Sequence, residues 1–210
     1  MAAKKTPTKK STSATKAAST TKQDSPSYTV PSLSLDDGAK VADILQGRLH
    51  ALIDLALTLK HIHWNVVGPH FIAVHEMIDP QVDAVQTMVD ETAERIATLG
   101  GVPLGTPGAV VAGRDWDDYS IGRASTIAHL GALDRVYEGV ITAHRQAAEN
   151  TEPLDVVTND MIVGHLGALE QFHWFVRAHL ETTGGTLSTS GASTEAAAAS
   201  QAERDAVDEP

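Results

Sequence analysis

Five residues between positions 60 and 96 have side chains that bind metal ions, and their spacing places them on common helix faces. The five are His63, His75, Asp79, Asp90 and Glu94. Imidazole nitrogen and carboxylate oxygen together suit borderline divalent cations of the first transition series. His75 and Asp79 are four positions apart, as are Asp90 and Glu94, so each pair shares one face of a helix. The pattern predicts a metal site.

The two pairs face the same way but lie too far apart to bind one ion within one chain. Asp90 follows Asp79 by eleven positions, which corresponds to roughly 1100° of helix rotation and about 16 Å of rise. Bonds from a metal ion to its ligands are only about 2.0 to 2.6 Å long. A single site therefore requires a second copy of this helix, running antiparallel beside the first. A two-fold axis then produces two shared sites per dimer.

Apolar residues recur at helical spacing both before His63 and beside the acidic pairs. The first stripe comprises Leu45, Leu49, Leu52, Ala56 and Leu59, and the second comprises Ile78, Val82, Val85, Val89 and Ile96. Such stripes are typical of the buried faces of amphipathic helices. A lone histidine on such a stripe is more often a core residue than a ligand, and acidic pairs more often form a solvated face. The five positions together favour the metal site over these two alternatives.

This segment resembles the signature of the Dps family (DNA-binding protein from starved cells), the bacterial mini-ferritins. The residues that carry the resemblance are Lys60, His63, Trp64, Asn65, Gly68, Phe71, His75, Glu76, Asp79, Asp90, Glu94 and Arg95. The resemblance covers roughly residues 35 to 183. It implies a dodecameric shell of four-helix bundles with ferroxidase centres at the two-fold interfaces.

The resemblance also implies a role for each matching residue. His63, His75 and Asp79 are expected from one subunit and Asp90 and Glu94 from its mate, with Lys60 and Trp64 near the site. Iron (Fe2+/Fe3+) is the implied metal, with hydrogen peroxide as its oxidant and Fe(III) mineral stored inside the shell. Protection of DNA from oxidative damage and a cytoplasmic, nucleoid-associated location are implied as well.

Two other motifs and two other functions remain as alternatives. The segment from His75 to Asp79 resembles the zinc-protease motif HExxH, but its last position is Asp and no third zinc ligand is evident. Glu170 and His173 form one Glu-x-x-His motif, whereas the intrahelical di-iron site of ordinary ferritins needs two, so a structural role is favoured. The alternative functions are a metal-dependent hydrolase on the same scaffold and a DNA-compacting protein without ferroxidase activity.

The positions of helix-breaking glycine and proline residues predict an all-α, ferritin-like four-helix bundle over residues 31–185, with a short helix in its long crossover. Ala and Leu are abundant, and Gly-Pro and Gly-Gly pairs separate long periodic segments. The expected helices begin near Asp36 or Asp37 and run to 65, then cover 71–99, 108–112, 120–149 and 154–183. Residues 186–210, rich in Ser, Thr and Ala, are expected to form a mobile tail.

The N-terminal segment, residues 1–30, is expected to be disordered because it is rich in lysine and lacks an apolar pattern. Residues 1–27 have a net charge of +5, which leaves −16 for the rest of a chain whose total is −11. Non-specific contact with DNA phosphates is the functional hypothesis, and a solubilising tail is the alternative. The lysines concerned are Lys4, Lys5, Lys9, Lys10, Lys16 and Lys22.

The remaining expectations concern the entry of iron into the shell and the location of the protein in the cell. Asp155 and Asp160, at the start of the fourth long helix, are candidates for the lining of an iron-entry pore. The chain has no cysteine, no signal-peptide pattern and no apolar run of membrane-spanning length. These features predict a soluble cytoplasmic protein with no membrane partner.

Overall fold

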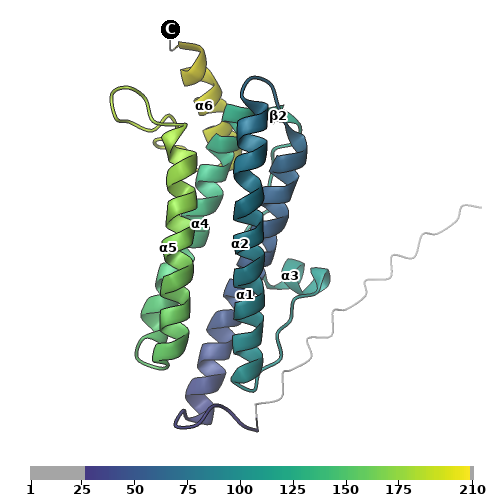
Figure 1. Ribbon diagram of the computed structural model, residues 1–210, viewed down its shortest axis with the longest axis vertical. Helices are drawn as coiled ribbons and strands as arrows, with labels where there is room; N and C mark the ends of the chain where they lie inside the picture. Colours follow the sequence, from purple (N-terminus) through teal and green to yellow (C-terminus); the bar gives the residue numbers. More distant parts are fainter. Residues whose placement is uncertain (1–26, 209–210) are drawn as a thin grey trace, which may run out of the picture.

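The computed structural model describes residues 27–208 and is mainly helical (Figure 1). Four long antiparallel helices form the bundle: α1 (Leu35–Asn65), α2 (Phe71–Thr98), α4 (Thr126–Thr151) and α5 (Val156–Ala178). The crossover between α2 and α4 contains the short α3 (Pro107–Gly113), and α6 (Glu195–Asp208) follows the bundle. The all-α architecture of four long helices with a short helix in the crossover, expected from the sequence, is confirmed.

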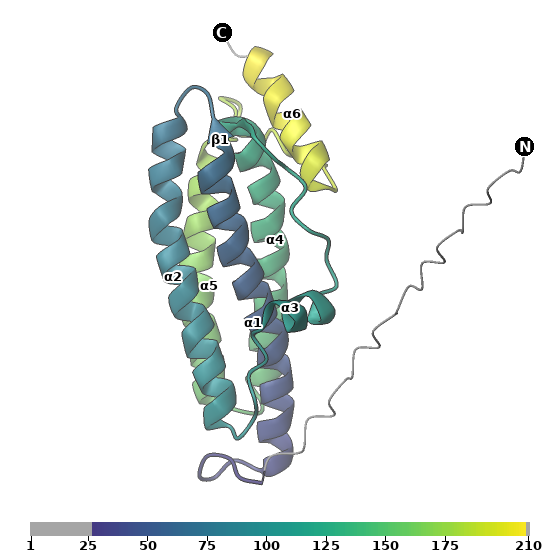
Figure 2. The same cartoon turned by 90° about the vertical axis from the view of Figure 1, so that its right-hand side faces the viewer.

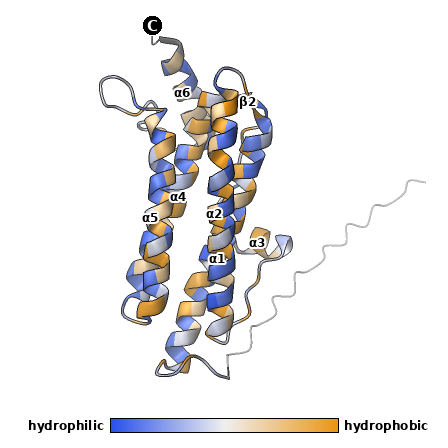
Figure 3. Cartoon of the chain, viewed as in Figure 1, coloured by the Kyte–Doolittle hydropathy of each residue, from blue (hydrophilic) through white to orange (hydrophobic). Residues whose placement is uncertain are grey.

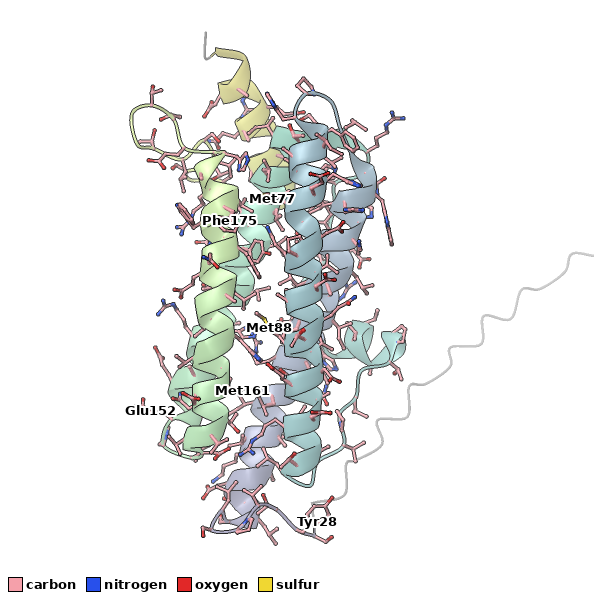
Figure 4. The ribbon with its side chains drawn as sticks, viewed as in Figure 1. Tyr28, Met77, Met88, Glu152, Met161 and Phe175 are labelled. Carbon is pink, nitrogen blue, oxygen red and sulfur yellow. The ribbon has the colours of Figure 1, made fainter. Side chains whose placement is uncertain are left out.

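Both stripes predicted from the sequence lie in the core between these helices. Leu45, Leu52 and Leu59 of α1 are fully buried, as are Ile78 and Val85 of α2. Each helix has an apolar and a polar side (Figure 3), as expected for helices that bury one stripe. Met88 of α2 and Met161 of α5 both line the groove between these two helices (Figure 4).

A short parallel β-ladder joins the two halves of the bundle at one end. Its strands, β1 (Val66–Val67) and β2 (Ala124–Ser125), follow α1 and precede α4. The crossover runs the length of the bundle, passes α3 and then lies beside α6 before it reaches β2 (Figure 2). The ladder therefore fixes the end of the crossover against the turn between α1 and α2.

Several helix boundaries differ from the predicted ones for identifiable reasons. Ser34, rather than Asp36 or Asp37, caps α1, since its side chain accepts the amide N–H of Asp37. α4 begins at Thr126, six positions later than expected, because residues 124–125 pair with β1. α5 ends at Ala178 instead of 183, and an isolated bridge between Glu181 and Leu187 turns the chain back.

The C-terminal segment departs most from the sequence-based expectation. Residues 195–208 are not part of a mobile tail but form α6, which packs against α4. Ala198, Ala199 and Ala202 are buried there, and the contact is close because α4 has a glycine, Gly131, opposite α6. A Cβ added to Gly131 would lie 2.7 Å from the carbonyl oxygen of Ala198. Small residues on both helices, rather than a large apolar stripe, make this interface.

Glu170 and His173 have the structural role that the sequence favoured. The His173 Nε2–H donates to Asp134 Oδ1 at 2.7 Å inside the bundle, and Asp134 also accepts the Thr189 hydroxyl. Glu170 pairs with Arg145 at the surface. The Asp134 carboxylate thus connects α4, α5 and the segment that leads to α6.

His144, in the middle of α4, makes the stability of the fold depend on pH. It is fully buried, and its Nδ1–H donates to the Val140 carbonyl. Burial, reinforced by the Arg48 guanidinium, lowers the pKa of His144 to about 3. The unfolded chain takes up this proton below pH about 6.5. The contribution of neutral His144 is therefore complete above pH 6.5 and is lost as the pH falls towards 3.

We expect His144→Leu to reduce the acid sensitivity of the fold. Between pH 6 and 4, the wild type should lose up to about 1.4 kcal/mol of unfolding free energy per pH unit through this one group. The variant should lose correspondingly less, whatever its stability at pH 7. Urea unfolding at several pH values measures the difference. The control is His179→Gln at an exposed site, and identical pH slopes for wild type and His144→Leu would contradict the assignment.

Candidate metal centre

The end of α1 and the beginning of α2 bring two of the predicted ligands, His63 and His75, into contact. Their rings stack with centroids 3.6 Å apart and an interplanar angle of 22°. The intervening turn reverses the chain through Gly68 and His70, both of which have positive φ. This tight reversal allows residues twelve positions apart in sequence to face each other.

The backbone orients both imidazoles in the same manner. The His63 Nδ1–H donates to the His75 carbonyl at 3.0 Å, and the His75 Nδ1–H donates to the His63 carbonyl at 2.9 Å. Because a carbonyl can only accept, each ring carries its proton on Nδ1 and leaves the Nε2 lone pair available. Within residues 27–208, neither Nε2 has a hydrogen-bond partner. Fixing Nδ1 to a carbonyl is the usual way to orient a metal-binding histidine.

Asp79 completes a three-residue group on this side of the bundle. Its Oδ1 accepts a hydrogen bond from Lys60 at 2.7 Å and lies 3.1 Å from His63 Nδ1. The hydrogen bond from Lys60, aided by the positive charges of Lys60 and the two histidines when protonated, lowers the pKa of Asp79 against the opposing effect of burial. Asp79 is therefore an anion at neutral pH, and Lys60 is hydrogen-bonded to its carboxylate.

Asp90 and Glu94 lie further along α2, and both side chains are exposed. Within the described residues, no group of three or more His, Asp or Glu side chains is close enough to hold a metal ion. One chain thus pairs His63 with His75 and places Asp79 beside His63 Nδ1, while the second acidic pair lies apart. The separation matches the helix geometry derived from the sequence, and the shared two-subunit site stays a prediction.

Large apolar side chains around the paired histidines are exposed on the single chain. Trp64 is 72% exposed, and Leu57, Phe71 and Ile72 are exposed nearby on α1 and α2. An apolar patch that surrounds polar groups is typical of a protein interface. Trp64, which follows His63 in the sequence, therefore lies on a surface suited to a partner.

The two residues nominated for a pore have different surroundings. Asp155 caps α5 and is largely buried, and its Oδ2 accepts hydrogen bonds from Thr158 and from Arg95, the latter at 2.5 Å. Burial raises the pKa of Asp155, but the bonds from Thr158 and Arg95 outweigh burial and lower it. Its charge is thus neutralised by Arg95. Asp160 lines a shallow groove between α2 and α5 together with Glu91 and His165, whose side chains are hydrogen-bonded to each other.

Sequence reasoning missed the contacts that hold the turn between the two histidines. The His61 Nε2–H donates to the carbonyl of Ile121, and the Thr126 hydroxyl donates to the carbonyl of Pro69. These partners lie about sixty positions apart, and no local pattern signals them. α6 was missed as well, although Thr194 followed by Glu195 and four alanines is a helix-start signal.

Comparison with known protein families assigns the fold. The family model described as a ferritin-like domain matches residues 42–185, which is most of the bundle. The DNA protection during starvation protein of Mycolicibacterium smegmatis is 57% identical over 178 residues, covering 85% of this chain and 97% of that protein. The chain belongs to the Dps family of ferritin-like proteins.

Solved structures of Dps proteins superimpose on the bundle. Mycobacterium smegmatis Dps matches with a TM-score of 0.77 and 57% identity, covering 79% of this chain and 99% of that one. DpsA14 from Streptomyces coelicolor also gives a TM-score of 0.77, with 63% identity and coverage of 78% and 97%. The family resemblance read from the metal-ligand motif is therefore confirmed.

Proposed function

We propose that this Dps protein oxidises iron(II) and stores iron(III) mineral. The observation that carries the proposal is the pair of stacked imidazoles, each fixed through Nδ1 so that its Nε2 is available to a cation. An anionic carboxylate, Asp79, lies beside them. This combination of nitrogen and oxygen donors suits iron(II), which is the substrate of the site.

The complete ferroxidase centre requires a second subunit. Asp90 and Glu94 of the mate supply the missing carboxylates when two α2 helices lie antiparallel across a two-fold axis. The exposed apolar residues around Trp64 support burial of this surface in such a dimer. Six such dimers make the dodecamer that we propose as the storage shell.

Charge and hydrogen bonding explain how these residues favour oxidation. Carboxylates stabilise iron(III) more than iron(II), because their charge interacts more strongly with the more highly charged ion. Two iron(II) ions each give one electron to hydrogen peroxide, whose O–O bond breaks to yield two hydroxide ions. Lys60 balances the charge of Asp79 before the metal arrives. The carbonyls that accept from Nδ1 hold both imidazoles in their metal-binding orientation throughout.

Iron entry and DNA protection complete the proposal. Asp160 is the better of the two pore candidates, because Arg95 neutralises Asp155. DNA is contacted non-specifically by Lys4, Lys5, Lys9, Lys10, Lys16 and Lys22, which lie outside the described residues. Iron(II) and peroxide generate damaging radicals together, so their joint removal at the shell protects DNA bound to it.

The direct test is particle mass with iron content after addition of iron(II) and hydrogen peroxide. We expect a twelve-subunit particle that retains iron in solution and oxidises iron(II) faster than buffer does. His63→Ala with His75→Ala should keep the particle mass and lose the fast oxidation. A wild-type particle that oxidises iron no faster than this variant would instead support a DNA-compacting protein without ferroxidase activity.

A further inference from the structure

The turn that carries the two imidazoles is held from outside by the crossover. β1 follows α1 directly after the last helical turn, and it pairs with β2 in the register Val66 to Ala124 and Val67 to Ser125. The Thr126 hydroxyl and the His61 ring add hydrogen bonds between the turn region and the crossover. The position of His63 relative to His75 therefore depends on where the crossover lies.

A two-residue ladder is too short to hold a long crossover in place by itself. α6 supplies two further contacts through carboxylates that face the crossover. Glu195 Oε2 accepts the Ser120 amide N–H at 2.9 Å and the Ser120 hydroxyl at 3.2 Å. Glu203 Oε1 accepts the Ser125 hydroxyl at 2.7 Å, and Ser125 is itself a residue of β2 and the N-cap of α4.

α6 can act as a brace because it is itself firmly attached to the bundle. Its buried alanines pack on α4 opposite Gly131, and the segment before it is bonded to α4 through Thr189 and Ala192. Figure 2 shows α6 lying along the end of α4 that carries β2 and adjoins the turn after α1. A continuous set of contacts thus runs from α6 through the crossover to the turn between the histidines.

We propose that α6 positions the paired imidazoles of the ferroxidase centre, with Glu195 and Glu203 as its positioning residues. The inference rests on the proposed function, since it concerns the same site. Without the two carboxylates, the Ser120 amide and the Ser120 and Ser125 hydroxyls lose these acceptors. The end of the crossover then keeps the short ladder, the hydrogen bonds of His61 and Thr126, and the hydrogen bond between Tyr119 and His129. The turn and the two rings then sample more orientations, which weakens metal binding without dismantling the bundle.

The first experiment compares the double variant Glu195→Ala, Glu203→Ala with the wild type, both as intact full-length particles. We expect faster amide hydrogen exchange in peptides covering residues 61–75, and cobalt(II) affinity lower by on the order of tenfold, as for other residues that orient metal ligands. Gln at both positions still accepts hydrogen bonds and should restore both readouts. Arg204→Ala, at an exposed position of α6, is the matched control.

The second experiment displaces α6 without touching its carboxylates. Gly131→Ala places a methyl group against the backbone of α6, so it should reproduce both effects in the full-length chain. Gly139→Ala, also on α4 but with nothing within 4 Å of the added Cβ, should change neither readout in the full-length chain. Unchanged exchange at 61–75 in the double Ala variant and in Gly131→Ala would overturn the proposed brace. Failure of wild-type cobalt(II) binding to respond to His63→Ala would count against the ferroxidase site instead.

Discussion

Asp90→Asn with Glu94→Gln abolishes rapid iron(II) oxidation, with a loss of at least about 100-fold in rate, if the centre is shared as proposed. The substitutions keep side-chain shape but remove both carboxylate charges that the mate contributes. Altering residues that only orient metal ligands already lowers metal affinity or activity 10- to 100-fold, so the loss of two anionic ligands should lower the oxidation rate by no less. Both side chains are exposed on the single chain, and the fold should be unaffected. Stopped-flow absorbance of iron(III) measures the rate.

A mixing experiment separates a shared site from one contained in a single chain. The Asp90→Asn, Glu94→Gln subunit retains both histidines, and a His63→Ala, His75→Ala subunit retains both carboxylates. Each mixed dimer contains one site with all five ligands and one that retains Asp79 alone. Activity should therefore reappear after subunit exchange, up to about half the wild-type level per mixed dimer. Persistent inactivity despite verified exchange would exclude ligands from two subunits.

Deleting residues 1–27 should leave the bundle and its iron chemistry intact while DNA binding is lost. The segment supplies six lysines to a chain that is otherwise strongly acidic, and an acidic shell repels phosphate. If the six lysines of one arm each neutralise a phosphate, affinity of the full-length protein should fall on the order of 1000-fold between 50 and 200 mM salt. Several arms on one particle bind together, so the loss on deletion is amplified by avidity.

The control for the DNA prediction changes the charge of the N-terminal segment while keeping its length. Replacing the six lysines with Gln should weaken binding as the deletion does, whereas replacing them with Arg should preserve it, because phosphate contact requires charge and no base recognition. Gel shifts on two unrelated DNA sequences at several salt concentrations measure all four proteins. Equal binding by the deletion and the full-length particle would identify the segment as a solubilising tail.

The sequence by itself determined the bundle and the chemistry of its candidate site. Helical spacing decides which residues share a face, so the stripes from Leu45 to Leu59 and from Ile78 to Ile96 predicted the core that is observed. The same arithmetic showed that Asp79 and Asp90 cannot reach one ion in one chain. Ligand type and spacing, together with the family motif, were sufficient because these constraints act between neighbouring residues along a helix.

The tertiary structure alone decided how the two histidines are oriented and what surrounds Asp155. The reciprocal bonds from Nδ1 of His63 and His75 to each other's carbonyls require the turn geometry, which a spacing of twelve residues does not specify. Likewise, the sequence gives no sign that the Asp155 carboxylate has partners, whereas in the fold it accepts hydrogen bonds from Arg95 and Thr158. Both outcomes depend on contacts between helices.

α6 shows most clearly where local patterns stop being informative. Its residues have little apolar periodicity, and their helix becomes stable by close packing on α4, where Gly131 admits the backbone of a helix rich in alanine. That contact joins positions more than sixty residues apart, so composition alone predicted a mobile tail. Side-chain type and period thus determine which faces are apolar and which residues can bind metal, whereas the approach of distant backbones determines which of those residues are held in place.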